Sequence, residues 1–144
     1  IWLAVIDWVE RNLLISLESA AQNAATPLAS LQAVFMAHIS FVKQHPGVPR
    51  LIFNELQKPD DSPVKISVRR ILEAYRQLLA RLLGAAEMDG QTDPGIDQAA
   101  AGMLFIGTVQ GLVMQSMLAG DTMQMEAVAE RVFMLYLDAI RRAP

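Results

Sequence analysis

The sequence contains no cysteine and only two histidines. Without cysteine the chain can form no disulfide, use no thiol in catalysis and hold no zinc through thiolates. Charged residues make up only 19% of the chain, and its formal net charge is −3. A surface that binds duplex DNA needs clustered lysine and arginine to displace counterions, so this acidic chain is a poor nucleic-acid binder by itself.

The residue pairs that build common helical-bundle enzymes are also missing. Di-iron bundles use a glutamate with a histidine three residues later, and no glutamate here has that partner. A globin needs a proximal histidine on a late helix, whereas His45 is the last histidine in the sequence. We therefore expect no catalysis, no metal and no cofactor, and a helical-bundle enzyme is the least favoured alternative.

Hydrophobic residues are abundant instead, at 53% of the 144 residues. This length suits one domain with a real core, spanning residues 1–144. Apolar side chains beyond the needs of one core must be buried against a partner or around an internal cavity. The first residues have neither the basic region nor the cleavage site of a signal peptide, and we expect the chain to begin inside a helix.

Apolar residues recur every three or four positions, which predicts an all-α fold without strands. About six helices are expected, over residues 1–21, 26–45, 50–56, 64–88, 94–119 and 122–142. Two of them should begin at capping residues followed by proline, Thr26 and Asp93. Gly120 suits the end of the fifth helix, and Asp121 or Thr122 is expected to cap the sixth.

The fifth predicted helix has no charged residue over Gln98–Gly120. Such a run is long enough to span a membrane, and Gly107 and Gly111 have the spacing at which membrane helices cross. However, Gln110 and Gln115 interrupt the run, and neither cationic nor aromatic residues mark its ends. We therefore predict a helix that is buried on most sides of a soluble, cytoplasmic protein.

The last two predicted helices are apolar over more of their surface than one core contact needs. We predict that these helices from two copies of the chain form a four-helix interface about a two-fold axis. The predicted interface residues are Leu104, Thr108, Gly111, Gln115 and Leu118 with Val128, Val132, Leu135 and Tyr136. Small side chains at Thr108 and Gly111 would let another helix approach closely. The alternative is burial of the same side chains within one subunit.

Two stretches resemble effector domains of the TetR family of transcriptional regulators. Residues 41–56 (FVKQHPGVPRLIFNEL) resemble the junction between the second and third helices of those domains. Residues 97–112 (DQAAAGMLFIGTVQGL) resemble a later helix with a small start, an apolar centre and a glycine. The number, order and lengths of the predicted helices agree with the family along essentially the whole chain.

The resemblance implies the C-terminal ligand-binding and dimerisation domain of a regulator, which we expect to be a repressor. A helix-turn-helix head would precede Ile1 and would make all contacts with operator DNA. A small, largely apolar or aromatic effector in each subunit would tilt the first helix and change the spacing of the two heads. The partners implied are therefore a second copy of the chain and this effector.

A ligand pocket needs mostly apolar walls and a few polar groups that orient the ligand. Aromatic residues can supply walls, deformable methionines suit varied ligands, and a buried glutamine or histidine needs a partner. The candidate ligand-binding residues are Trp8, Phe35, His38, Phe53, Tyr75, Met103, Gln110 and Met114. The alternative is that the apolar ones are core residues, that the polar ones are satisfied or exposed, and that the chain is an interaction module with a filled interior.

Basic residues are frequent in the fourth predicted helix. They are Lys65, Arg69, Arg70, Arg76 and Arg81. Because these positions do not line one face and Glu73 lies among them, we interpret them as a solvated helix surface rather than a phosphate site.

Overall fold

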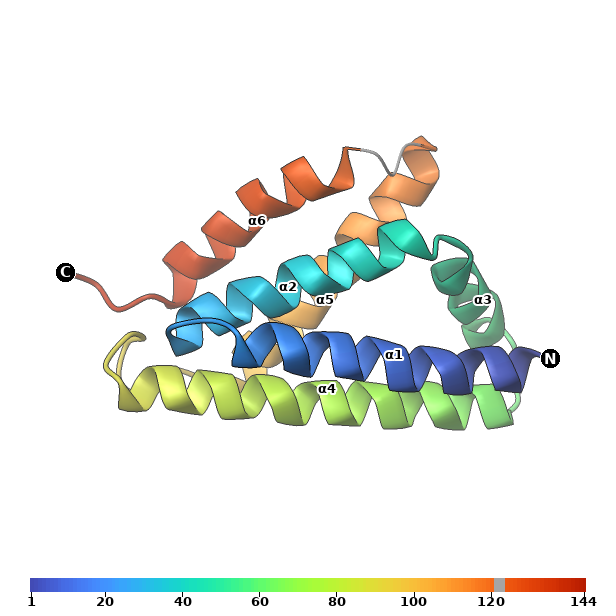
Figure 1. Cartoon of the computed structure of the whole chain (residues 1–144), viewed down its shortest axis with the longest axis horizontal. Coiled ribbons are helices and arrows are strands. Elements are labelled where there is room, and N and C mark those ends of the chain that lie inside the picture. Colours follow the sequence, from blue (N-terminus) through green and yellow to red (C-terminus); the bar gives the residue numbers. More distant parts are fainter. Residues whose placement is uncertain (121–123) are drawn as a thin grey trace.

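The computed structural model describes residues 1–120 and 124–144, and the described part is helical without strands. The helices are α1 (Trp2–Gln22), α2 (Pro27–Gln44), α3 (Gly47–Leu56), α4 (Pro63–Met88), α5 (Gln98–Ala119) and α6 (Met125–Ile140). Figure 1 shows α1 and α4 side by side along the length of the molecule, with α2 crossing above them. The predicted all-α class and the six helices in this order are confirmed.

Side-chain caps fix where three of the helices begin. Thr26 accepts a hydrogen bond from the Ala29 backbone N–H at 3.1 Å, and Pro27 follows at the first helical position. Ser62 accepts from the Lys65 backbone N–H at 3.1 Å in the same way. Each such cap stabilises a helix by about 1 kcal/mol because it satisfies a backbone donor that has no partner within the helix.

The predicted start of α5 at Asp93 is wrong. The helix begins at Gln98, where Asp97 accepts a hydrogen bond from the Ala100 backbone N–H at 3.0 Å. Between the two aspartates, Gly95 has a left-handed backbone with φ of +74°, which interrupts a right-handed helix. The Asp93 carboxylate instead accepts from the Ala143 backbone N–H at 3.2 Å.

The end of α5 agrees with the sequence, because Gly120 follows the helix with a φ of +72°. The capping residues predicted for the last helix, Asp121 and Thr122, lie outside the described residues. The last helix ends at Ile140, which places Arg141 beyond its final turn.

The main core lies where α2, α5 and α6 meet. The rings of Phe35, Phe105 and Phe133 are fully buried there. The centroid of the Phe35 ring lies 5.4 Å from that of Phe105 and 5.1 Å from that of Phe133. Each buried ring contributes on the order of 1.5–3 kcal/mol, so this cluster anchors the last two helices to the rest of the bundle.

Ion pairs join α1 to α4 across the solvent-facing side of their contact. Both carboxylate oxygens of Glu10 accept hydrogen bonds from Arg70 at 2.7 Å, and Glu18 accepts from Arg81 at 2.6 Å. Arg69 pairs with Asp61 on the neighbouring loop. These arginines of α4 therefore lie on the protein surface in ion pairs, in agreement with the predicted solvated helix surface.

Within the described residues α5 is the one helix whose length and composition would allow it to cross a membrane. A core helix of a soluble protein passes the same test. Here α5 contributes several fully buried side chains to the bundle and contacts α2, α4 and α6. Its apolar composition is therefore partly explained by packing within the subunit.

Candidate ligand-binding cavity

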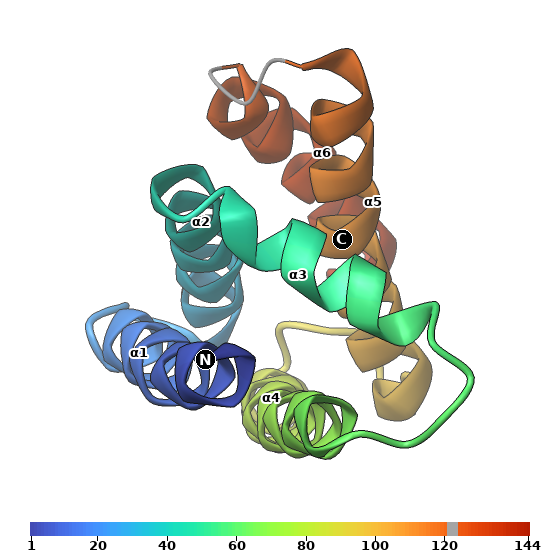
Figure 2. The same ribbon diagram turned by 90° about the vertical axis from the view of Figure 1, so that its right-hand side faces the viewer.

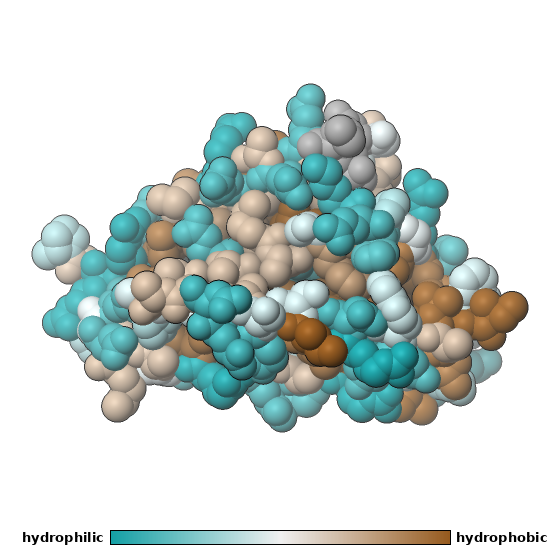
Figure 3. All heavy atoms as spheres, in the orientation of Figure 1, coloured by the Kyte–Doolittle hydropathy of each residue, from teal (hydrophilic) through white to brown (hydrophobic). Residues whose placement is uncertain are grey.

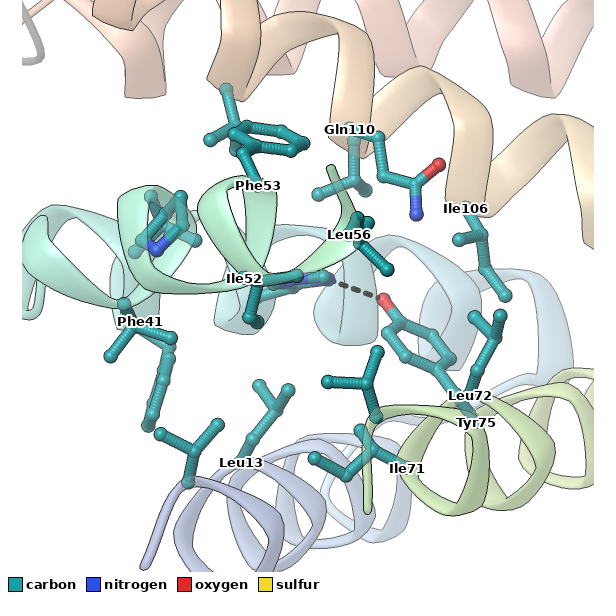
Figure 4. A pocket seen from close by; sticks show the side chains of 18 of the residues that line it. Leu13, Phe41, Ile52, Phe53, Leu56, Ile71, Leu72, Tyr75, Ile106 and Gln110 are labelled. Atoms are coloured by element: carbon teal, nitrogen blue, oxygen red, sulfur yellow. Dashed lines mark hydrogen bonds between the residues drawn. The ribbon is translucent and has the colours of Figure 1, made fainter. Parts of the chain in front are cut away.

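A cavity of about 290 Å³ lies between the first five helices. Its walls come from α1 (Val9, Leu13), α2 (His38, Phe41, Val42), α3 (Val48, Pro49, Ile52, Phe53, Leu56), α4 (Lys65, Val68, Arg69, Ile71, Leu72, Tyr75) and α5 (Ile106, Val109, Gln110, Val113). Figure 4 shows these side chains converging on one space. The volume lies at the lower end of the range of about 300–1,000 Å³ that is typical of small-molecule sites.

The short helix α3 forms one wall of the cavity. It runs from the end of α2 toward α4, across the space between α2 and α5 (Figure 2). Its apolar side chains Ile52 and Phe53 line the cavity, yet both keep part of their surface accessible. These two side chains therefore present apolar surface to the space inside the cavity.

The polar centre of the cavity is a pair of uncharged side chains. The Nδ1 atom of His38 and the hydroxyl of Tyr75 share a hydrogen bond of 2.9 Å. Burial lowers the pKa of His38 to about 4, so its imidazole is neutral near pH 7. Burial also raises the pKa of Tyr75 well above its ordinary value, and the phenol keeps its proton. Neither group carries a charge into the cavity.

Charged residues occur only toward one end of the cavity wall, in the first turns of α4. The ammonium group of Lys65 donates to the Asp60 carbonyl oxygen at 2.8 Å and also to the carbonyl of Lys58. Arg69 donates to the Asp61 carboxylate at 2.5 Å. Both cations have partners, Arg69 is exposed and Lys65 is half-buried, and they form the rim of the cavity.

Apolar side chains are also exposed on the outer surfaces of α5 and α6. Leu118 is 83% exposed and Leu135 is 72% exposed in the single chain. A Cβ atom added at Gly107 or Gly111 would meet no atom within 4 Å, so this side of α5 is open to another helix. A second exposed apolar patch lies where α1 begins, at the right-hand end of Figure 3, and it includes Ile1.

Comparison with known proteins decides the family. Residues 27–132 match the model of the tetracyclin repressor-like C-terminal domain, which covers well over half of the chain. The chain belongs to this TetR family. No curated protein sequence matches it. The predicted family and functional class are thus confirmed, and the chain is the C-terminal ligand-binding domain of a TetR-family regulator.

Solved structures share the fold of this TetR-family domain at low sequence identity. The transcriptional regulator FadR from Bacillus subtilis, in complex with stearoyl-CoA, has a TM-score of 0.82 at 18% identity, covering 94% of this chain and 73% of its own. The ketosteroid transcriptional regulator KstR2 of Mycobacterium tuberculosis has a TM-score of 0.77 at 19% identity, covering 96% and 72%. A TetR regulator from Chloroflexus aurantiacus has a TM-score of 0.81 at 16% identity, covering 98% and 73%.

The structure brings together half of the ligand-binding residues that the sequence suggested for this TetR-family domain. His38, Phe53, Tyr75 and Gln110 all line the cavity. In Figure 4 the side chain of Gln110 extends from α5 toward the cavity, and the Tyr75 hydroxyl lies near its centre. Their contact with a ligand remains a prediction.

The other four candidates lie elsewhere. Phe35 belongs to the closed aromatic core with Phe105 and Phe133. Trp8 is partly exposed and packs its ring against Phe41 and His45, with a centroid distance of 4.9 Å to His45. The spacing of apolar residues along a helix could not separate core positions from cavity positions, because both kinds of residue face inward.

The two methionines chosen for the cavity point away from it. Met103 and Met114 are both exposed on the outer surface of α5, beside the predicted interface residues. We had expected them in the cavity wall, but α5 buries a narrower arc than its uniform apolar composition suggests, with Phe105, Val109 and Leu112 on the buried side.

Most of the predicted interface residues lie on the surface of the TetR-family domain. Leu104, Gln115, Leu118, Val128 and Leu135 are exposed, and Thr108 and Gly111 are partly exposed. Val132 is half-buried against the core. Tyr136 is the exception, because it is buried within the subunit and its hydroxyl donates to the Ala101 carbonyl oxygen at 2.8 Å. Its place in a two-fold contact was a wrong prediction.

Apart from Phe53 and Tyr75, the walls from α3 and α4 were missed by sequence reasoning, as was Ile106 on α5. The missed residues include Ile52, Leu56 and Leu72. The amphipathic pattern of α3 could have identified the α3 residues, because so short a helix must bury its apolar side against neighbouring helices. Here that apolar side covers the space between the neighbouring helices.

Proposed function

We propose that this chain is the effector-binding and dimerisation domain of a TetR-family repressor that senses a small, largely apolar molecule. The observation that carries the proposal is the cavity of about 290 Å³, which is apolar apart from a neutral polar centre, Gln110 and the two cations of its rim. An interaction module with a filled interior would have no reason to keep such a space, because unfilled volume in a core is destabilising.

The related structures support an apolar effector. FadR from Bacillus subtilis was solved with stearoyl-CoA, and KstR2 is described as a ketosteroid regulator. Both names point to molecules with a large hydrocarbon part. The walls of the cavity here are hydrocarbon as well, from Leu13 on α1 to Val113 on α5. We assign the domain no reaction, since both relatives are named as transcriptional regulators, and we propose that it works in the cytoplasm.

We further propose that two copies pair through α5 and α6. The exposed leucines Leu118 and Leu135 and the open side of α5 at Gly111 support this arrangement. Each leucine buried on pairing would contribute on the order of 1.5–3 kcal/mol before the cost of association. Pairing would hold two DNA-binding heads in a fixed relation, as a two-fold symmetric operator requires.

The effector signal would travel through α1. This helix lines the cavity with Val9 and Leu13, and it is tied to α4 by Glu10 and Arg70. A ligand that fills the cavity would change how α1 lies on α4, and the heads of the dimer would move with it. Operator DNA would be contacted only by the helix-turn-helix heads, because the present chain has a net charge of −3.

A matched pair of substitutions tests the ligand cavity. Both glutamines are exposed, but Gln110→Trp places a bulky ring in the cavity wall, whereas Gln77→Trp makes the same change on α4 outside the cavity. We expect apolar compounds that raise the melting temperature of the wild-type chain to lose this effect in Gln110→Trp and to keep it in Gln77→Trp. Equal stabilisation of both variants would contradict the assignment of the cavity.

A further inference from the structure

The cavity has an orientation along α4. Lys65, Arg69, Leu72 and Tyr75 line it from successive turns of this helix. Six residues separate Arg69 from Tyr75, which corresponds to about 9 Å along the helix axis at a rise of about 1.5 Å per residue. At one end Arg69 is exposed and Lys65 is half-buried, whereas Tyr75 farther along the helix is buried. The lining therefore runs from a charged end at Lys65 and Arg69 to a neutral part at Tyr75, which we call the inner end.

The inner end offers an adaptable hydrogen-bonding group in addition to the Gln110 amide. The His38–Tyr75 hydrogen bond can form in either direction, because a neutral imidazole carries its proton on one nitrogen or the other. If Nδ1–H donates to the phenol oxygen, the Tyr75 O–H is free to donate to a ligand carbonyl. If the phenol donates to Nδ1, its oxygen can accept from a ligand hydroxyl. The Tyr75 hydroxyl lies near the middle of the side chains in Figure 4, where a ligand would reach it.

The same end is unsuited to a charged group. His38, Tyr75 and Gln110 are uncharged, and the remaining side chains on this part of the wall are hydrocarbon, such as Leu72 and Ile106. A carboxylate placed there would lose its hydration without gaining a cation as partner, which strongly disfavours binding. The nearest cations of the wall, Lys65 and Arg69, lie at the other end.

From this arrangement we propose that the effector carries one uncharged oxygen function, a carbonyl or a hydroxyl, which binds the Tyr75 hydroxyl at the inner end of the cavity. The rest of the molecule is hydrocarbon that lies along α4 toward the rim. Tyr75 and His38 thus determine specificity, and they distinguish neutral oxygenated molecules both from plain hydrocarbons and from acids. This inference rests on the proposed ligand-sensing function and narrows the class of effector.

Four probes of the same shape and the same number of non-hydrogen atoms test it on the 144-residue chain. Acetophenone carries a carbonyl, 1-phenylethanol a hydroxyl, cumene a methyl group in the same place and benzoate a carboxylate. Calorimetric titration should give acetophenone and 1-phenylethanol an affinity roughly three- to tenfold above that of cumene, the effect of one net hydrogen bond. Benzoate should bind no more tightly than cumene.

Tyr75→Phe should remove the preference and leave the affinity for cumene in place. Tyr136→Phe is the matched control, since it deletes another buried tyrosine hydroxyl, bonded to Ala101 outside the cavity, and should preserve the preference. If Tyr75→Phe fails to fold, the affinities of the four probes for the wild-type chain still test the proposal. Equal binding of the three neutral probes, or tightest binding of benzoate, would overturn this inference alone. Failure of every probe, cumene included, would overturn the proposed ligand cavity as well.

Discussion

The neutral state of His38 is the residue-level feature on which the chemistry of the cavity depends. Its imidazole shares a hydrogen bond with Tyr75 and is surrounded by apolar walls from four other helices. Desolvation penalises the charged imidazolium, which lowers the pKa of His38 from 6.5 to about 4. The folded protein therefore favours the unprotonated ring far more than the unfolded chain does.

A dependence of stability on pH follows from this shift. Above about pH 6.5 the ring is neutral in both states, and its contribution to the free energy of unfolding is constant. As the pH falls toward about 5, the unfolded chain takes up a proton that the folded chain does not, so stability declines by up to about 2 kcal/mol. Urea unfolding of the wild-type chain at a series of pH values measures this decline.

Two variants test whether His38 causes this decline in stability. His38→Gln removes the titrating group, and its stability should change much less between about pH 6.5 and 5. His45→Gln removes the only other histidine and leaves His38 in place, so the wild-type decline should persist. An unchanged decline in His38→Gln would mean that other groups cause it and that the imidazole is not held neutral by burial.

At the scale of helices, much of the fold was predictable because apolar spacing and capping residues act locally. Thr26 with Pro27 and Gly120 mark helix ends that the structure confirms. The start of α5 was misplaced because Asp93 and Asp97 are both good caps. The choice between them depends on Gly95, whose left-handed backbone is a property of the folded loop.

The candidate site was only half predictable for a related reason. Spacing shows which side of a helix faces inward, but not whether the inward space is filled. Phe35 and His38 lie one turn apart on α2, yet Phe35 packs in the core and His38 lines the cavity. That difference depends on how α3 bridges α2 and α4, which is a long-range feature that no local pattern encodes.

The outer surfaces of α5 and α6 lead to a prediction about assembly. In sedimentation at micromolar concentration we expect the chain, with a mass of 15.8 kDa, to behave as a dimer. Leu118→Glu combined with Leu135→Glu should give a folded monomer. The introduced carboxylates would repel one another and would be costly to bury in the proposed interface, which now contains leucines.

The matched control for assembly is Ile15→Glu, which changes an exposed apolar residue of α1 on another part of the surface. This variant should remain dimeric. A monomeric wild-type chain, or an Ile15→Glu variant that dissociates as readily as the leucine pair, would contradict the proposed interface.

For the molecule as a whole, the large share of hydrophobic residues has three destinations. One part fills the aromatic core around Phe105, a second surrounds the cavity, and a third remains exposed, mainly on α5 and α6 and where α1 begins. The second and third parts would be liabilities in an isolated monomer without a ligand. Together with the TetR-family match over residues 27–132, they are consistent with a sensor whose ligand and partner complete its burial.

Xenon binding tests the cavity most directly, since xenon enters dry apolar cavities and needs no hydrogen bond. Diffraction from crystals of the chain under xenon pressure should show xenon between the helices, in contact with Leu13, Ile52 and Ile106. A closed interior, with α3 packed onto α4 and α5 and xenon absent from that space, would contradict the account.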